Sequence, residues 1–210
     1  LMTFLSVLIG LILGSLIAAA RFFRVPVLSQ VLAVFVTVYN GVPVIVALMI
    51  YNLLFLLKFN DLAAALGLHM TVADVPTVYV GVFTLSLTAT CGLSEALRGA
   101  LLSIDKGQFE AGRSLGLNNA KTMQYIILPQ AFKNVLPALA NEFITLLKET
   151  SVSGYIATMD LAKAGDLIQS RTYSAFMPLI AVALIYLGLV MFMTAGVNRL
   201  ERRLRRSDNR

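Results

Sequence analysis

The chain has 210 residues, of which 58% are hydrophobic and only 13% are charged, and its formal net charge is +6. Soluble domains usually carry about 25% charged residues, so this composition excludes an ordinary water-soluble fold and predicts an integral membrane protein. A single cysteine and a single histidine exclude an internal disulfide framework and disfavour a Cys/His metal site. Because the chain begins with Leu1 rather than methionine, we expect a further segment to precede it.

Five apolar segments are candidate transmembrane helices in an all-α, polytopic fold. A helix that rises about 1.5 Å per residue needs about 20 apolar residues to cross the hydrocarbon of a bilayer. The fourth segment is the least apolar because it contains Asn141, Glu142 and Thr145, so it should face protein or water rather than lipid. In chain order the expected spans are residues 2–20, 31–57, 75–97, 135–147 with flanks, and 175–197.

Gly41 and Pro43 interrupt the second expected span. Proline removes a backbone donor and disfavours a helical conformation in the residue before it. Within a membrane such a break persists only where protein or water satisfies the freed backbone groups. Two interpretations are open: a kink that serves helix packing, or a break that lines a substrate path.

Basic residues predict the orientation of the chain. Most of the 17 Lys and Arg residues lie in the first connection, the third connection and the C-terminal tail. The positive-inside rule makes these segments cytoplasmic, with the N-terminus outside and the C-terminus inside, and no nucleic-acid partner is needed to explain the charge. The cytoplasmic set is Arg21, Arg24, Arg98, Lys106, Arg113, Lys121, Lys133, Arg199, Arg202, Arg203, Arg205, Arg206 and Arg210, and the remaining set is Lys58, Lys148, Lys163 and Arg171.

The third connection, residues 99–131, differs from the rest because it mixes charged residues with glycine and other small residues. A short helix is predicted over residues 107–115, with Gly116 just past its end as a C′ residue. Small side chains let another backbone come close, so Ala111, Gly112 and Gly116 predict a docking surface. The alternative is an amphipathic helix that lies on the lipid headgroups.

The spacing of this segment resembles the EAA loop of ABC importer permeases. Its pattern is Glu110-Ala111-Gly112, then Gly116, then Ile126 and Leu128-Pro129, with glycine at position 112 where the family usually has a second alanine. Five further motifs resemble the polar amino acid permease family: SEALRG (94–99), GQFEA (107–111), SLGL (114–117), ILPQA (127–131), and NEFI (141–144) followed by LKETS (147–151).

The resemblance implies a type I ABC importer permease fold with five transmembrane helices, multi-pass in a prokaryotic cytoplasmic (inner) membrane. The EAA loop is implied to form a coupling helix that sits in a groove of a cytoplasmic ATPase. Implied partners are two ABC ATPase subunits, a second permease subunit that is identical or homologous, an extracytoplasmic amino-acid-binding protein, and the lipid bilayer. The residues implied in ATPase coupling are Glu110, Ala111, Gly112, Gly116 and Leu117.

We expect this chain to be no enzyme, because it lacks a P-loop of its own. The motif G-x-x-x-x-G-K-S/T cradles phosphates with backbone amides after a strand. The nearest stretch, residues 116–122, has three intervening residues where four are needed, and Ala120 in place of the second glycine. No cofactor is therefore expected in the chain, and ATP with Mg²⁺ is expected on the partner ATPase.

Polar residues recur at helical spacing on the fourth expected span. Asn141 and Thr145 lie on one face, and Glu142 lies beside them. A zwitterionic amino acid offers an ammonium to Glu142 and two groups that can hydrogen-bond with Asn141 and Thr145. The alternative is that these residues hydrogen-bond between helices and hold the bundle together. The candidate substrate path is Asn141, Glu142 and Thr145, together with Gly41 and Pro43.

On the third expected span, Glu95 and Arg98 are three residues apart and are predicted to form a structural pair. Thr84 and Thr88 are predicted to bond with carbonyls of their own helix. Cys91 is expected to be a small buried residue.

Two other function classes compete with the importer permease. A secondary transporter or a channel needs no ATPase, but such carriers usually contain internal repeats and more spans. An intramembrane enzyme is disfavoured because no H-E-x-x-H motif and no Ser or Cys paired with His occurs in a span. The third connection distinguishes an importer permease from a secondary carrier, because a carrier has no reason to project a helix with small side chains at this spacing into the cytoplasm.

Overall fold

The computed structural model describes residues 1–208, with the side chains of residues 1–203. All of its regular elements are helical, as the sequence predicts. In chain order they are α1 (Met2–Phe22), α2 (Leu28–Asn40), α3 (Val44–Ala65), η1 (Val72–Asp74), α4 (Val78–Leu102), α5 (Lys106–Ser114), α6 (Asn119–Thr122), η2 (Met123–Ile127), α7 (Leu128–Glu149), η3 (Thr150–Ile156), α8 (Leu161–Thr172) and α9 (Phe176–Asp208). The side chains of Arg205 and Arg206, and all of Arg210, lie outside the described residues.

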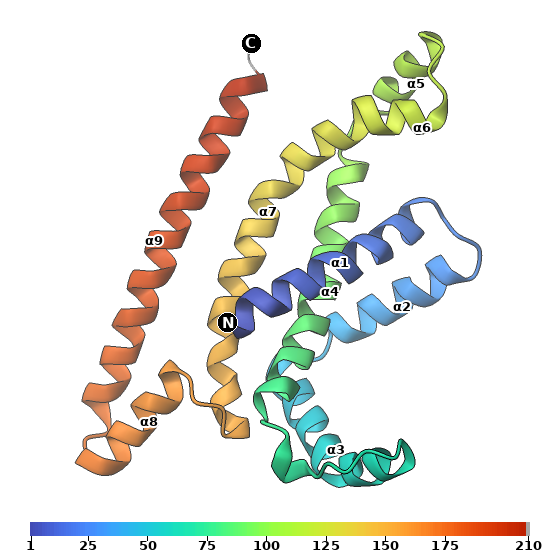
Figure 1. Cartoon of the computed structure of the whole chain (residues 1–210). Coiled ribbons are helices and arrows are strands. Elements are labelled where there is room, and N and C mark those ends of the chain that lie inside the picture. The colour runs from blue at the N-terminus through green and yellow to red at the C-terminus, as the bar shows by residue number, and fades with distance from the viewer. Residues whose placement is uncertain (209–210) are drawn as a thin grey trace.

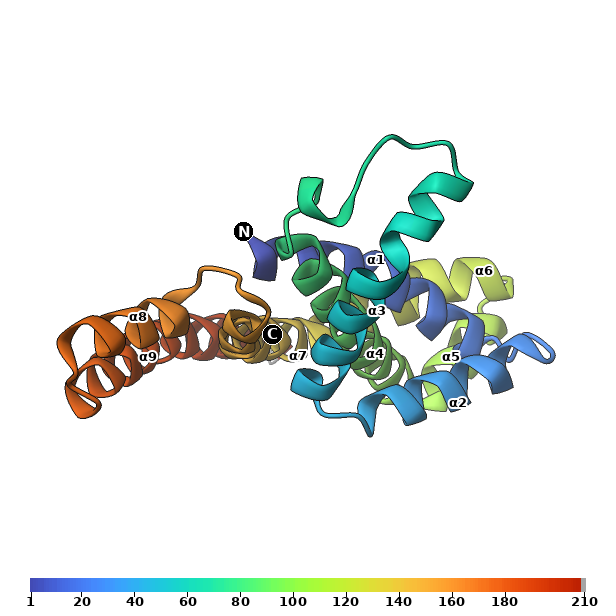
Figure 2. The same cartoon turned by 90° about the horizontal axis from the view of Figure 1, so that it is seen from below.

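The long helices form an open bundle around α4 and α7. Helix α1 packs along α4, α4 packs on α7, and α9 reaches the bundle through α7 and α8. Figure 2 shows α8 and α9 on one side of α7 and the helices α1–α6 on the other. Helices α5 and α6 lie at the same end of the molecule as the last turns of α9, and α8 lies at the opposite end (Figure 1).

A stripe of small residues brings α1 close to α4. A Cβ atom added at Gly10 would lie 3.0 Å from the Ala89 carbonyl carbon, and one at Gly14 would lie 3.0 Å from the Thr90 carbonyl oxygen. Gly10 and Gly14 form a G-x-x-x-G pattern, which permits this close backbone approach between membrane helices. The buried stripe on α1 consists of Thr3, Ser6, Gly10, Gly14 and Ala18.

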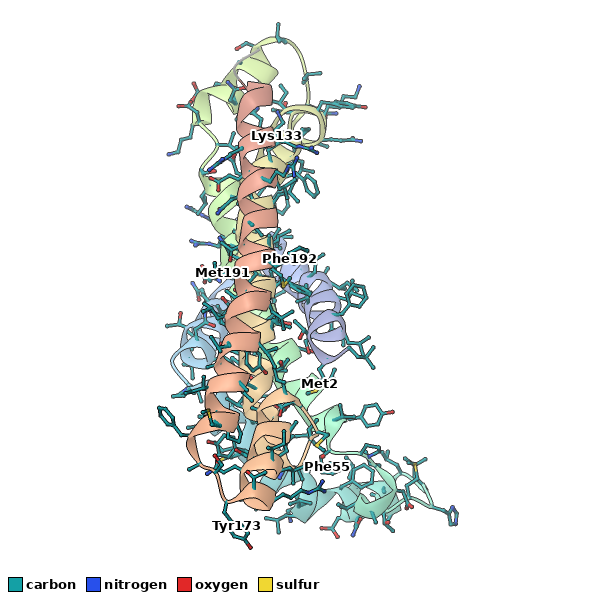
Figure 3. The ribbon with its side chains drawn as sticks, turned by 90° about the vertical axis from the view of Figure 1, so that its left-hand side faces the viewer. Met2, Phe55, Lys133, Tyr173, Met191 and Phe192 are labelled. Carbon is teal, nitrogen blue, oxygen red and sulfur yellow. The ribbon has the colours of Figure 1, made fainter. Side chains whose placement is uncertain are left out.

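Among the described residues, four helices are long and apolar enough to cross a membrane: Met2–Phe22, Val44–Ala65, Val78–Leu102 and Phe176–Arg203. They correspond to four of the five expected spans. The fourth expected span lies in α7, whose 22 residues are long enough but too polar to qualify by composition. On α9, Met191 and Phe192 are 62% and 81% exposed, as suits a helix surrounded by lipid or a second subunit (Figure 3).

The second expected span, residues 31–57, is interrupted at Gly41 and Pro43, as the sequence predicts. The chain breaks at Gly41 and Pro43 into α2, with 13 residues, and α3, with 22 residues. Pro43 is the N-cap of α3 with an extended ψ of 135°, so the proline ends one helix and begins the next. The third span also differs, because α4 begins at Val78, after Pro76, and continues to Leu102.

The third connection is shorter than expected because α4 and α7 each extend into it. Its short helix, α5, begins one residue earlier than predicted because the Asp105 carboxylate accepts a hydrogen bond from the Gly107 amide at 2.6 Å. Gly116 has a φ of +80°, which confirms its predicted place as the C′ residue. The amides of Gly116 and Leu117 donate to the carbonyls of Arg113 and Gly112, at 2.9 and 3.1 Å, in a Schellman motif.

Candidate functional site

Helix α5 and its flanking turn stand at the tip of the molecule, away from the main bundle (Figure 1). In the part of the chain that the structure describes, α5 packs mainly on α6 and η2. Glu110, Ala111 and Gly116 are exposed, and Leu117 is half-buried. Leu115 is 80% exposed, so an apolar side chain projects at this tip.

Gly112 does not lie on the outer side with Ala111 and Gly116. It is buried, and a Cβ atom there would lie 2.7 Å from Thr122 Cγ2 and 2.9 Å from Ile126 Cδ1. The three small residues therefore do not form one docking side. Gly112 instead lets α5 pack closely against its own chain, and only Ala111 and Gly116 are available to a partner.

The segment that joins this tip to α7 contains a π-helical turn, η2. Pro129 follows it in the first turn of α7 and has no amide hydrogen, so the carbonyl of Tyr125, four residues earlier, cannot be paired in the α pattern. Turns of the π type are rare and occur mainly as single turns inside α-helices. The predicted motif of Ile126, Leu128 and Pro129 thus marks the place where the helical pitch changes.

The N-terminal end of α7, which lies nearest α5 and which we call its inner end, is tied to the segment that leads into α5. The Asn134 side-chain amide donates to the Ser103 hydroxyl at 3.0 Å, and that hydroxyl donates to the Ala100 carbonyl at 2.8 Å. The Gln130 amide, one turn away on the same helix, donates to the Ile126 carbonyl at 2.9 Å. Asn134 precedes Asn141 by two helical turns and so shares its face, but local spacing gives no signal for the bond of Asn134 with Ser103, which is 31 residues away.

The three polar path candidates on α7 lie farther along the helix. Asn141 and Thr145 are exposed, and Glu142 is half-buried with its carboxylate directly against Gly92 of α4. Within the described part of the chain, none of these three side chains makes a hydrogen bond or an ion pair. Asn141 lines a cavity of about 590 Å³ between α4, α7 and the C-terminal end of α9. Figure 3 places Lys133, which lines the same cavity, toward the end that carries α5.

Gly41 and Pro43 lie in a different place from Asn141. They occupy the exposed break between α2 and α3, and Val42 lines a separate cavity of about 510 Å³ on that side. Tyr39, just before the break, donates to the Thr84 carbonyl at 3.4 Å and joins α2 to α4. The structure of a single chain therefore does not bring the two parts of the predicted path into one cavity.

Glu95 pairs with two arginines. Its carboxylate lies 3.7 Å from Arg98, the predicted partner, and 2.6 Å from Arg21 at the end of α1. The Arg21 side chain is 9% exposed, whereas the Arg98 side chain is 37% exposed. The shorter pair joins α1 to α4 through two residues that are 74 positions apart in the chain, so local spacing could not reveal it.

The remaining predictions for α4 are confirmed. Thr84 donates to the Val80 carbonyl at 2.8 Å and Thr88 donates to the Thr84 carbonyl at 3.2 Å. Cys91 is buried. Among the described residues, His, Cys, Asp and Glu side chains form no group of three or more that could hold a metal ion.

Known proteins of the same kind match nearly the whole chain. Residues 8–206 match the family described as binding-protein-dependent transport system inner membrane component. The arginine transport system permease protein ArtQ of Bacillus subtilis is 33% identical over 97% of this chain and 87% of its own length. The glutamine transport system permease protein GlnP of Escherichia coli is 33% identical over 93% of this chain and 84% of its own.

Solved structures match in fold as well. A crystal structure of an amino acid ABC transporter with histidines has a TM-score of 0.82 and 35% sequence identity, and the match covers 96% of this chain and 88% of that one. The MetNI methionine ABC transporter, in an inward-facing conformation, has a TM-score of 0.75 at 20% identity, which supports the fold alone. The chain thus belongs to the binding-protein-dependent transport system inner membrane components, as a multi-pass inner-membrane permease subunit with the type I ABC importer fold.

Proposed function

We propose that this chain is the permease subunit of an ATP-driven importer of polar amino acids, and that it couples to a cytoplasmic ATPase through α5. The observation that carries the proposal is the position of α5 at the tip of the molecule, with Glu110, Leu115 and Gly116 exposed. This tip lies at the same end as the basic end of α9, which the positive-inside rule makes cytoplasmic. The permeases that resemble this chain are named for glutamine and arginine transport.

The proposal includes the partners that such a subunit needs. Residues 1–210 form a single permease domain with the N-terminus outside. In this proposal two ATPase subunits carry ATP and Mg²⁺. It is supported by residues 116–122 of this chain, which form a Schellman turn and the whole of α6 rather than a phosphate-binding loop after a strand. A second permease subunit and an extracytoplasmic binding protein complete the importer.

The proposed substrate path runs along the outer part of α7. Asn141 and Thr145 are exposed on the isolated chain, and polar groups that face hydrocarbon are costly. A second permease subunit that covers this face turns it into an internal, polar path. Glu142 then meets the substrate ammonium, and the break at Gly41 and Pro43 contributes exposed backbone to the path.

The competing function is a secondary transporter or channel that needs no ATPase. Co-purification of the tagged chain with its ATPase, followed by a substrate screen of the binding protein, separates the two. The importer predicts a stable complex whose ATPase activity rises when the binding protein carries its amino acid. A chain that transports without any ATPase bound contradicts the proposal.

Gly116→Trp tests the coupling role of α5 within such a complex. Gly116 has a φ of +80°, which glycine adopts freely and asparagine tolerates, but which tryptophan does not. We expect the tryptophan variant to insert normally and to lose stimulated ATPase activity and transport at least tenfold. The matched Gly116→Asn variant should retain most of both. Full transport by the tryptophan variant would show that α5 does not dock on the ATPase.

A further inference from the structure

One side chain, Gln130, joins three elements at the base of the exposed tip. Its amide nitrogen, on α7, donates to the Ile126 carbonyl of η2 at 2.9 Å. The same nitrogen donates a longer bond to the Gln108 side-chain oxygen of α5, at 3.4 Å. A single amide group therefore connects α5, the π-helical turn and α7.

The packing around this amide leaves α5 little freedom to slide. Gly112 lies so close to Thr122 and Ile126 that even one added carbon would meet Thr122 Cγ2 at 2.7 Å. Thr122 is fully buried. Ile126 thus contacts Gly112 with its side chain and accepts a hydrogen bond from Gln130 with its carbonyl, so the close packing at Gly112 and one of the two Gln130 bonds involve the same residue.

Direct contact matters because the two covalent connections of α5 are short turns. Residues 103–105 join it to α4, and residues 115–118 join it to α6. A turn can absorb a small displacement by changing its backbone angles, whereas a helix with intact hydrogen bonds is stiff. A push on α5 therefore reaches α7 most directly through the contacts at η2.

We propose that Gln130 is a positioning residue that clamps α5 to η2 and α7, so that displacement of α5 moves the helix that carries Asn141 and Glu142. The inference rests on the proposed coupling of α5 to an ATPase and adds the internal link between that contact and the path. The two glutamines have different roles in this contact. Gln130 supplies the donor for both bonds, whereas Gln108 supplies only an acceptor.

This asymmetry gives a matched pair of variants. Gln108→Glu keeps an acceptor oxygen in place for the Gln130 amide. Gln130→Glu has the same charge and size but replaces the donor with a carboxylate that faces two acceptor oxygens. Gln124→Glu, at an exposed position of η2 with no hydrogen bond in the described chain, controls for added charge at this end.

The experiment uses the complete importer with its ATPase and binding protein in lipid vesicles. It measures co-purified ATPase, basal ATPase activity, and amino acid transported per ATP hydrolysed. We expect Gln130→Glu to keep the first two and to lower transport per ATP at least threefold. Gln108→Glu and Gln124→Glu should stay within a factor of about 1.5 of the unchanged protein.

Three results overturn the clamp: unchanged transport per ATP in Gln130→Glu, an equal loss in Gln108→Glu, or a loss of ATPase binding together with coupling. If Gln130→Glu is not inserted, Gln130→Met removes the donor without adding charge, and the same thresholds apply to it. An unchanged protein that fails to bind any ATPase would refute the proposed function itself, which this design distinguishes from failure of the clamp.

Discussion

The two halves of α7, the inner half nearest α5 and the outer half beyond it, carry similar polar residues in different surroundings. At the inner end, Gln130 and Asn134 are both hydrogen-bonded to groups of the same chain. Farther along, Asn141, Glu142 and Thr145 have no such partner in the described part of the chain, although Glu142 is half-buried. The comparison distinguishes polar side chains that are hydrogen-bonded within the chain from those that can be paired only by water, a substrate or another subunit.

The physical reason is that a polar group removed from water is costly unless it is paired. The inner residues meet this requirement within the chain, so they need no partner outside it. The outer residues meet it only when a second subunit, water or a substrate covers them. A polar pattern on a membrane helix therefore does not by itself identify a substrate path, and the difference lies in whether each side chain is already satisfied.

The largest expected effect comes from placing a side chain at Gly112, where α5 packs closely against Thr122 and Ile126. Gly112→Leu forces a side chain against Thr122 and Ile126, and overpacking of this kind costs about 1–3 kcal/mol or more. We expect α5 to leave its position and co-purification with the ATPase to fall below a tenth. Gly188→Leu on α9, where an added carbon meets nothing within 4 Å, is the control. Normal assembly of Gly112→Leu would show that α5 does not depend on this contact.

The next effect tests the outer half. Glu142→Gln keeps the shape of the side chain and removes its charge, and a hydrogen bond to a charged group is worth about 1.5–3 kcal/mol. We expect transport to fall roughly tenfold or more, or to favour a different amino acid, while insertion and ATPase binding stay unchanged. Transport assays with a panel of labelled amino acids measure this. An unchanged transport rate and an unchanged apparent affinity for the amino acid would show that Glu142 has a structural role.

A smaller effect is expected from Asn134→Leu. It removes the hydrogen bond with Ser103, which is worth about 1 kcal/mol. We expect the melting temperature to fall by about 2–4 °C and transport per ATP to fall by at most about fivefold. Ser103→Ala removes the same bond from the other side. If the two residues act as a pair, the double variant is no worse than the poorer single variant. Additive losses would mean that Asn134 has a second role, as part of the path.

The smallest effect concerns the ion pairs of Glu95, which lie at the inner end of α4. Arg21→Gln should lower the melting temperature more than Arg98→Gln, because Arg21 is closer to the carboxylate and its side chain is nearly buried. Exposed pairs contribute about 0–1 kcal/mol, so Arg98→Gln should change stability very little. Thermal unfolding in detergent measures both. A larger loss of melting temperature in Arg98→Gln would show that the pair predicted from spacing, Glu95 with Arg98, contributes more to stability than the pair with Arg21.

The class of the protein and the family resemblance of its exposed loop can be predicted from the amino-acid sequence alone. Apolar length predicts spans whether or not their packing is known, because each helix satisfies its own backbone in lipid. Turn chemistry is equally local, so Gly116 was predictable as the residue after α5, and Pro43 as a point of interruption. The loop motif, from Glu110 to Pro129, resembles a family by spacing alone.

The side that each residue faces and the partner that it contacts depend on how the helices pack. The tertiary structure placed Gly112 inward against Thr122, joined Arg21 to Glu95, and paired Asn134 with Ser103. Helical spacing fixes neighbours three or four residues apart, but it contains no information on which helix lies beside that face. These contacts depend on how α1, α4 and α7 pack, which is why the polar face of α7 looked uniform in sequence and divides into two halves in space.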